Sequence, residues 1–233
     1  MDQEADTTFG GTVAGVGDKG RMQFIKAGGG SLALSGSIEL ATETRVSGGR
    51  LYINGATTAF SDEVGTTAIR VDGGTLGGTG TVTVTDNADV MLTVTGKLAA
   101  GIEGAAGRTT YALNGGTLNL SAATASTNTG WLKFDLGDPT TAGVTYDEIR
   151  LTSGALNIGT GLDVDAFDIQ LSPNPKSGSY VLFETGAPIV GSLGTATGTI
   201  AGTSWITGTL SIDGNNLVME VFVPPRGTLI HVR

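Results

Sequence analysis

The chain has 233 residues, a formal net charge of −9, 39 glycines, one histidine and no cysteine. The absence of cysteine excludes disulfides and thiolate metal sites, and the scattered basic residues argue against nucleic acid or an anionic lipid surface as partner. Glycine well above the usual ~7%, with only 15% charged residues, disfavours a coiled coil or an ordinary helical enzyme. No segment approaches the roughly 18 consecutive apolar residues of a membrane helix, so we expect no membrane span.

Residues 1–27 are predicted to form an N-terminal arm and the first strands. Residues 15–20 read Gly-Val-Gly-Asp-Lys-Gly, which matches the G-x-G-x-x-G string of dinucleotide sites. That string needs a helix directly after it, whereas residues 21–25 are typical of a strand, so we interpret it as a turn. Residues 2–8 are expected to be disordered, with docking on a neighbouring molecule as the alternative.

A short phrase recurs over residues 28–129 and once more, altered, at residues 153–158: Gly-Gly, one variable residue, Leu, and then alternating apolar residues. We interpret the leucines that follow each glycine pair as one recurring position in a unit of roughly 20 residues. Strand-like residues 90–94 and 131–134 would fill the two longest gaps between them. The anchoring leucines are Leu32, Leu51, Leu76, Leu118 and, after a slightly altered phrase, Leu156.

This phrase has a simple physical reading as a stack of short strands. Alternation places Leu32 and Leu34 on one face of a strand, and Gly-Gly allows a tight corner before it. A single such coil cannot bury its apolar face, whereas stacked coils form a continuous core. Residues 28–129 are therefore predicted to be β-solenoid repeats in an all-β protein.

Longer strands and more aromatic residues follow residue 130. Residues 213–216, Asp-Gly-Asn-Asn, predict a hairpin turn between the last two strands. A repeat array needs a terminal unit that covers its open apolar end. We therefore expect C-terminal solenoid coils and a cap over residues 130–223, followed by a flexible tail over residues 224–233.

Residues 73–82, Gly-Gly-Thr-Leu-Gly-Gly-Thr-Gly-Thr-Val, resemble the passenger-associated β-strand repeat of bacterial autotransporters and related surface proteins. The strands at residues 131–134, 146–151, 154–158 and 179–183 are similar in order to the end of such passengers. The resemblance covers roughly residues 28–223. It implies a right-handed parallel β-helix with a C-terminal β-rich cap, located outside a bacterial cell or on its surface. The family shares no catalytic residues, so the resemblance implies none here.

Catalytic signals are sparse. The single histidine, His231, lies two residues from the end of the sequence given and is a poor candidate base. Without a second histidine or any cysteine, Ser-His-Asp, Cys-His and histidine-rich zinc sites are excluded within one chain. We expect no catalytic residue and no cofactor.

Three carboxylates within six residues, Asp163, Asp165 and Asp168, are weak candidates for a metal site. Hard cations such as Ca²⁺ prefer oxygen ligands, and Asp163 and Asp165 would share one face of a strand. An EF-hand loop is excluded because Phe167 takes one of the ligand positions. We favour a solvated face, with a calcium site as the alternative.

Two other groups, Asp147-Glu148 with Arg150 and Asp62-Glu63, could supply the acid and base for glycan cleavage. We interpret them as charges on a loop or exposed face. The sequence thus predicts a non-enzymatic extracellular protein for structural support, surface display or adhesion, which self-associates into a fibre or layer or binds glycans and proteins of a surface or matrix. A glycan-binding or glycan-cleaving β-helix is the alternative.

Overall fold

The computed structural model describes residues 4–14, 23–40, 43–61 and 67–225. Strands make up 57% of the structure and helices 3%, which confirms the expected all-β class. The helical part consists of α1 (Ser121–Thr124) and the 3₁₀ helix η1 (Val164–Ala166). No helix in this described part of the chain is long and apolar enough to cross a membrane.

A seven-stranded sheet runs the length of the molecule, and all its neighbouring strands are parallel. β3 and β14 alternate buried apolar residues with more exposed ones, as strands of a half-buried sheet do. From one edge to the other they are β1 (Thr7–Phe9), β3 (Ser31–Leu34), β6 (Arg50–Ile53), β9 (Thr75–Gly77), β12 (Lys97–Ala99), β14 (Leu132–Leu136) and β16 (Phe167–Leu171).

A fourteen-stranded sheet contains two further rows of parallel strands. The first row consists of β4 (Ser37–Leu40), β7 (Ala56–Ala59), β10 (Thr81–Val84), the first parts of β13 (Arg108–Asn119) and β15 (Glu148–Leu162), and β17 (Gly178–Thr185). The second row consists of β2 (Phe24–Lys26), β5 (Thr44–Val46), β8 (Thr67–Val71), β11 (Asp89–Leu92), the second parts of β13 and β15, and β18 (Val190–Leu193).

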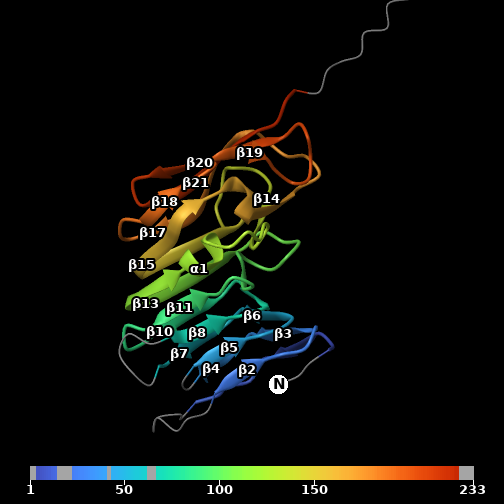
Figure 1. The fold of residues 1–233 in the computed structure, drawn as a ribbon. Coiled ribbons are helices and arrows are strands. Elements are labelled where there is room, and N and C mark those ends of the chain that lie inside the picture. Colours follow the sequence, from blue (N-terminus) through green and yellow to red (C-terminus); the bar gives the residue numbers. More distant parts are fainter. Residues whose placement is uncertain (1–3, 15–22, 41–42, 62–66, 226–233) are drawn as a thin grey trace, which may run out of the picture.

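From β3 to β18 the chain visits the seven-stranded sheet, the first row and the second row in that order, again and again. We call one such circuit a pass. Figure 1 shows the passes stacked along one axis, from blue at the N-terminal end to red at the other. Residues distant in sequence are therefore neighbours across passes.

Side chains at paired positions of successive passes form columns through the stack. In the seven-stranded sheet, Leu51 pairs in register with Leu76 and Leu76 with Leu98, and all three side chains are fully buried. The column continues through Leu132 to Phe167. Such columns belong to a single apolar cluster between the sheets, because each pass covers the apolar face of the next.

The recurring leucines do not all occupy one position. Leu32, Leu51 and Leu76 pair in register, as predicted. Leu118 and Leu156 instead pair with each other in the second row, so the prediction is wrong for these two. The reason is that Gly-Gly marks any tight corner: Gly115 and Gly154, both at positive φ, lie where β13 and β15 bend between the two rows.

The C-terminal strands reverse the pairing. β21 (Asn216–Phe222) is antiparallel to β17, β20 (Thr207–Asp213) to β21, and β19 (Thr197–Thr199) to β20. The predicted hairpin turn is confirmed, with Gly214 at φ 59° between β20 and β21. Phe134 and Phe183 pack at this end with ring centroids 5.7 Å apart.

At the opposite end, residues 4–8 are ordered, which corrects the expectation of disorder for that part of residues 2–8. β1 pairs with β3, and Asp6 Oδ1 accepts a hydrogen bond from the backbone N–H of Ser31 at 2.7 Å. The predicted turn at residues 15–20 lies outside the described residues, as do Asp62, Glu63, His231 and residues 226–233 of the tail.

Candidate functional site

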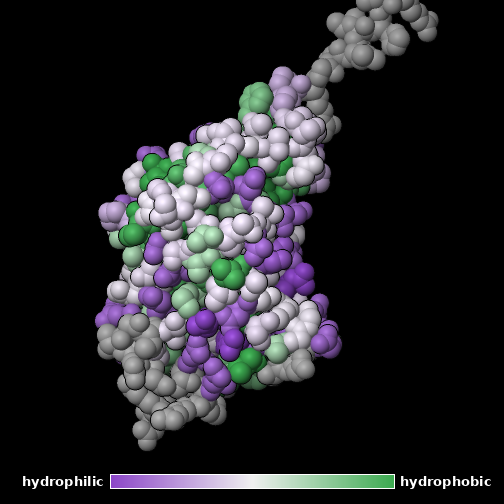
Figure 2. Space-filling view, in the orientation of Figure 1, coloured by the Kyte–Doolittle hydropathy of each residue, from purple (hydrophilic) through white to green (hydrophobic). Residues whose placement is uncertain are grey.

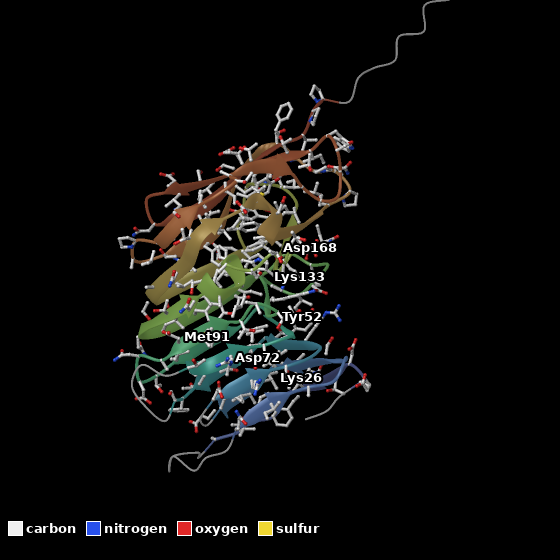
Figure 3. All side chains as sticks on the ribbon, in the orientation of Figure 1. Lys26, Tyr52, Asp72, Met91, Lys133 and Asp168 are labelled. Carbon is white, nitrogen blue, oxygen red and sulfur yellow. The ribbon has the colours of Figure 1, made fainter. Side chains whose placement is uncertain are left out.

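A groove of about 580 Å³ lies on the outer face of the seven-stranded sheet, over β12, β14 and β16. The outward residues of these strands form its floor, since Leu132 and Ile169 point into the core while Lys133 and Asp168 stay partly exposed. Figure 3 shows Lys133 and Asp168 at successive levels on one side of the stack, with Tyr52 on the same side.

The groove exists because the later passes carry longer connections at one corner. Between the seven-stranded sheet and the first row, the early passes need only residues 35–36, 54–55 and 78–80. The later passes use residues 100–107, 137–147 and 172–177 at the same place. Parts of all three longer segments line the groove and form its walls.

Asp147 joins two of these walls. It is 1% exposed, and its Oδ1 accepts a hydrogen bond from the backbone N–H of Gly107 at 2.6 Å. Its Oδ2 accepts one from the backbone N–H of Asp135 at 2.7 Å. Burial raises the pKa of Asp147 to about 8, and the two backbone donors only partly oppose that rise. At neutral pH the buried carboxyl group is therefore mostly protonated.

Asp135 occupies the groove floor beside it. Its Oδ2 accepts a hydrogen bond from the backbone N–H of Gly104 at 2.7 Å, which ties the 100–107 segment to β14. Burial raises the pKa of Asp135; nearby backbone donors lower it, and the charges of Glu103 and Asp168 raise it further. The charges of Glu103 and Asp168 thus hinder the ionisation of Asp135.

Lys133 is the basic residue of the groove floor. Its Nζ lies 3.0 Å from Asp168 Oδ2 and 3.1 Å from Glu103 Oε1. Burial alone would lower the pKa of Lys133, but its hydrogen bonds to both carboxylates outweigh that and raise the pKa. Arg50 holds the other oxygen of Glu103 at 2.9 Å. These pairs fix the 100–107 segment over the sheet.

The residues proposed from sequence for glycan chemistry are only partly brought together. Asp147 and Glu148 are 1% and 2% exposed, so neither lies on an exposed face. Asp147 does lie in the connection before β15, but Glu148 begins that strand, so the interpretation as charges on a loop or exposed face is wrong for Glu148. Glu148 pairs with Arg108, and Arg150 lies 3.0 Å from a Glu184 oxygen, on the first row of the other sheet. Of that trio only Asp147 is among the residues that line the groove.

The three candidate metal ligands are also separated. Asp165 lies in η1 and Asp163 precedes it, so they do not share a strand face; the chain turns there to bury Val164 and Ala166. Asp163 accepts a hydrogen bond from the backbone N–H of Thr195. Asp163 and Asp165 line a cavity of about 210 Å³, whereas Asp168 faces Lys133 in the groove.

Among the residues that the structure describes, no group of three or more His, Cys, Asp or Glu side chains could hold a metal ion. The groove residues Glu103, Lys133 and Asp135 were not identified from sequence. Alternation around Leu132 and Phe134 signals that Lys133 and Asp135 face outward. No local sequence pattern predicts that Glu103 lies close to Lys133 and Asp135.

Comparison with known proteins gives no family. A scan against protein-family models finds no match, and a search of curated proteins finds no significant match. Function must therefore be argued from the geometry of this chain.

Proposed function

We propose that this chain is a right-handed parallel β-helix, closed at its C-terminal end by β19–β21, that acts outside a bacterial cell as a structural or adhesive scaffold. Support comes from the chain path, in which each pass visits the same three rows of strands in the same order. The antiparallel strands end the parallel rows, as a cap on a repeat array should.

One observation carries this proposal: parallel pairing in the seven-stranded sheet runs without a break from β1 to β16. At about 4.8 Å per strand, those six steps span roughly 29 Å. Each added pass would lengthen the molecule while repeating the same core packing. Such a molecule suits the role of a spacer between a cell and the surface that it contacts.

Adhesion or self-association would use the outer surface. Large apolar side chains exposed near the C-terminal strands include Trp205 at 47%, Phe222 at 56% and Ile212 at 40%. Figure 2 shows hydrophobic residues scattered among polar ones over the visible face. We propose contacts of modest strength, repeated between copies of the chain or made to matrix proteins and glycans.

Sedimentation velocity and electron microscopy of the purified chain test this proposal. We expect elongated particles that associate as concentration rises, with β-type circular dichroism. A helical spectrum would contradict the fold, and saturable turnover of any substrate in a polysaccharide panel would contradict the non-enzymatic role. Monodisperse particles at all concentrations would contradict self-association.

A further inference from the structure

We propose that the groove over β12, β14 and β16 binds a short, uncharged oligosaccharide. This inference does not depend on the scaffold role, because it rests on the shape and chemistry of one local cavity. Its volume of about 580 Å³ falls within the ~300–1,000 Å³ of typical small-molecule sites.

The groove is formed by insertions between strands of the stack. In repeat architectures, insertions gathered on one face often mark the binding face, and here residues 100–107, 137–147 and 172–177 all insert at one corner. Asp147 and Asp135 hold two of these segments in place through three backbone hydrogen bonds. A ligand would therefore meet walls that are already positioned, which lowers the entropy cost of binding.

The polar floor places hydrogen-bond donors beside acceptors. Lys133 is in register with Asp168, and Asp135 is in register with Gln170. Along β14 a donor, Lys133, is followed by an acceptor, Asp135. Along β16 the acceptor Asp168 is followed by Gln170, whose amide both donates and accepts and donates to Asp168 Oδ1 at 3.3 Å. Neighbouring strands lie about 4.8 Å apart and alternate residues about 6.6 Å apart.

A hydroxyl group suits this pattern because it both donates and accepts, whereas an ammonium group only donates and a carboxylate only accepts. The hydrogen bonds and ion pairs that the groove carboxylates already make leave further lone pairs on them, which can accept hydrogen bonds from a ligand. The groove also has apolar lining, which could cover the C–H face of a sugar ring. The apolar lining residues whose side chains are not fully buried are Ala106, Leu171 and Pro173.

Charge selects against acidic sugars. Four carboxyl groups line the groove, against the single ammonium group of Lys133: those of Glu103, Asp135, Asp147 and Asp168. Two of those carboxylates already pair with Lys133, so a uronate or sulfate would gain no free cation there. Repulsion between the groove carboxylates and an acidic sugar would therefore disfavour its binding.

Isothermal titration of the full chain with cellotriose, maltotriose, mannotriose, xylotriose and N,N′,N″-triacetylchitotriose, beside trigalacturonate, tests the proposal. We expect at least one neutral trisaccharide to bind with a dissociation constant of about 1 mM or tighter, and trigalacturonate to bind at least about tenfold more weakly. Ligand-observed nuclear magnetic resonance would check the same probes.

Two variants locate the binding. Gln170→Ala removes an exposed floor residue, and Ser172→Trp fills the groove from the third inserted segment. Both should weaken binding about tenfold or more. The matched control Gln23→Ala changes an exposed glutamine outside the groove and should leave affinity unchanged.

The proposal fails if no neutral probe binds at about 10 mM. It also fails if trigalacturonate binds as well as the best neutral probe, or if both groove variants bind normally while folded. Circular dichroism and particle shape of the same samples report separately on the scaffold, so its failure and the failure of the groove proposal are distinguishable.

Discussion

The backbone N–H of Asp135 donates a hydrogen bond to Asp147 Oδ2 over 2.7 Å, across a corner where the chain leaves the seven-stranded sheet. The other oxygen of Asp147 reaches Gly107, one pass earlier in the stack. One buried carboxyl group thus holds two consecutive long connections together. The shape of the groove therefore depends on the side chain of Asp147.

Asp147 should make stability depend on pH. Its pKa is raised from 3.8 in the unfolded chain to about 8, so the folded state retains a proton that the unfolded state has lost between those values. Its contribution to stability is greatest below about pH 4, falls as pH rises towards 8, and changes little beyond. The total change is at most about 6 kcal/mol.

Urea unfolding of wild type and Asp147→Asn between pH 5 and pH 9 would measure this. The neutral amide cannot ionise, so the variant should be less stable than wild type at pH 5 but show a flatter pH profile. Equal slopes for the two proteins would show that Asp147 does not cause the effect. Asp163→Asn, at a carboxylate outside the groove, is the control and should keep the wild-type slope.

Lys26 should be important for stability. Its side chain is 0% exposed, and its Nζ donates hydrogen bonds to the carbonyl oxygens of Ala27, Gly28 and Gly48, at 2.6, 3.1 and 3.3 Å. Lys26→Met would keep the length of the side chain but leave these acceptors without that donor. We expect a loss of about 2–4 kcal/mol.

Chemical denaturation would give the free energy of unfolding for this variant. Lys97→Met, at an exposed lysine on the outer face of β12, should stay within about 0.5 kcal/mol of wild type. A similar loss in both variants would mean that removal of positive charge, and not the loss of the buried contacts, destabilises the protein.

The sequence predicted the β class and the last hairpin because both follow from local patterns. Alternation over Leu32 and Leu34 predicts a half-buried strand, and Asp-Gly at residues 213–214 predicts a turn. The position of a strand within the stack is less local. Leu118 follows Gly-Gly as Leu76 does, yet it lies in another row, because the same small residues serve every corner.

The groove was beyond sequence reasoning for a related reason. Glu103 and Lys133 meet at 3.1 Å although they are a full pass apart, and Asp168 comes from yet another pass. Their distance depends on the register between passes, which changes with the length of each connection. The burial of Asp147 likewise depends on where two separate segments fold, so its local polar neighbours misled the prediction of exposure.

The apolar column of the seven-stranded sheet should be sensitive to truncation. Leu98 is fully buried and pairs with Leu76 on one side and Leu132 on the other, so Leu98→Ala would leave a cavity between passes. We expect a loss of about 3–5 kcal/mol. Val94→Ala, at a side chain 50% exposed in the connection before β12, should cost less than about 1 kcal/mol in the same denaturation experiment. Equal losses would contradict a tightly packed column.

Close approach between passes explains at least one glycine of the recurring phrase. A Cβ on Gly116 would overlap the carbonyl oxygen of Ala88 in the preceding pass, and that atom belongs to backbone that cannot move aside freely. Gly116→Ala should therefore force the two passes apart at the bend of β13, at a cost of several kcal/mol, about 2–4. Gly186→Ala is the matched control, because the nearest atom to its added Cβ lies 3.9 Å away and its φ is not in the left-handed region.

Thermal unfolding of both glycine variants would separate steric contact from the general effect of replacing glycine. The control should be as stable as wild type or slightly more so, because alanine reduces the entropy of the unfolded chain. A normal melting temperature for Gly116→Ala would show that the passes can separate there without cost. The glycine pair would then serve only the bend in the backbone, and the register of β13 against β11 would need another cause.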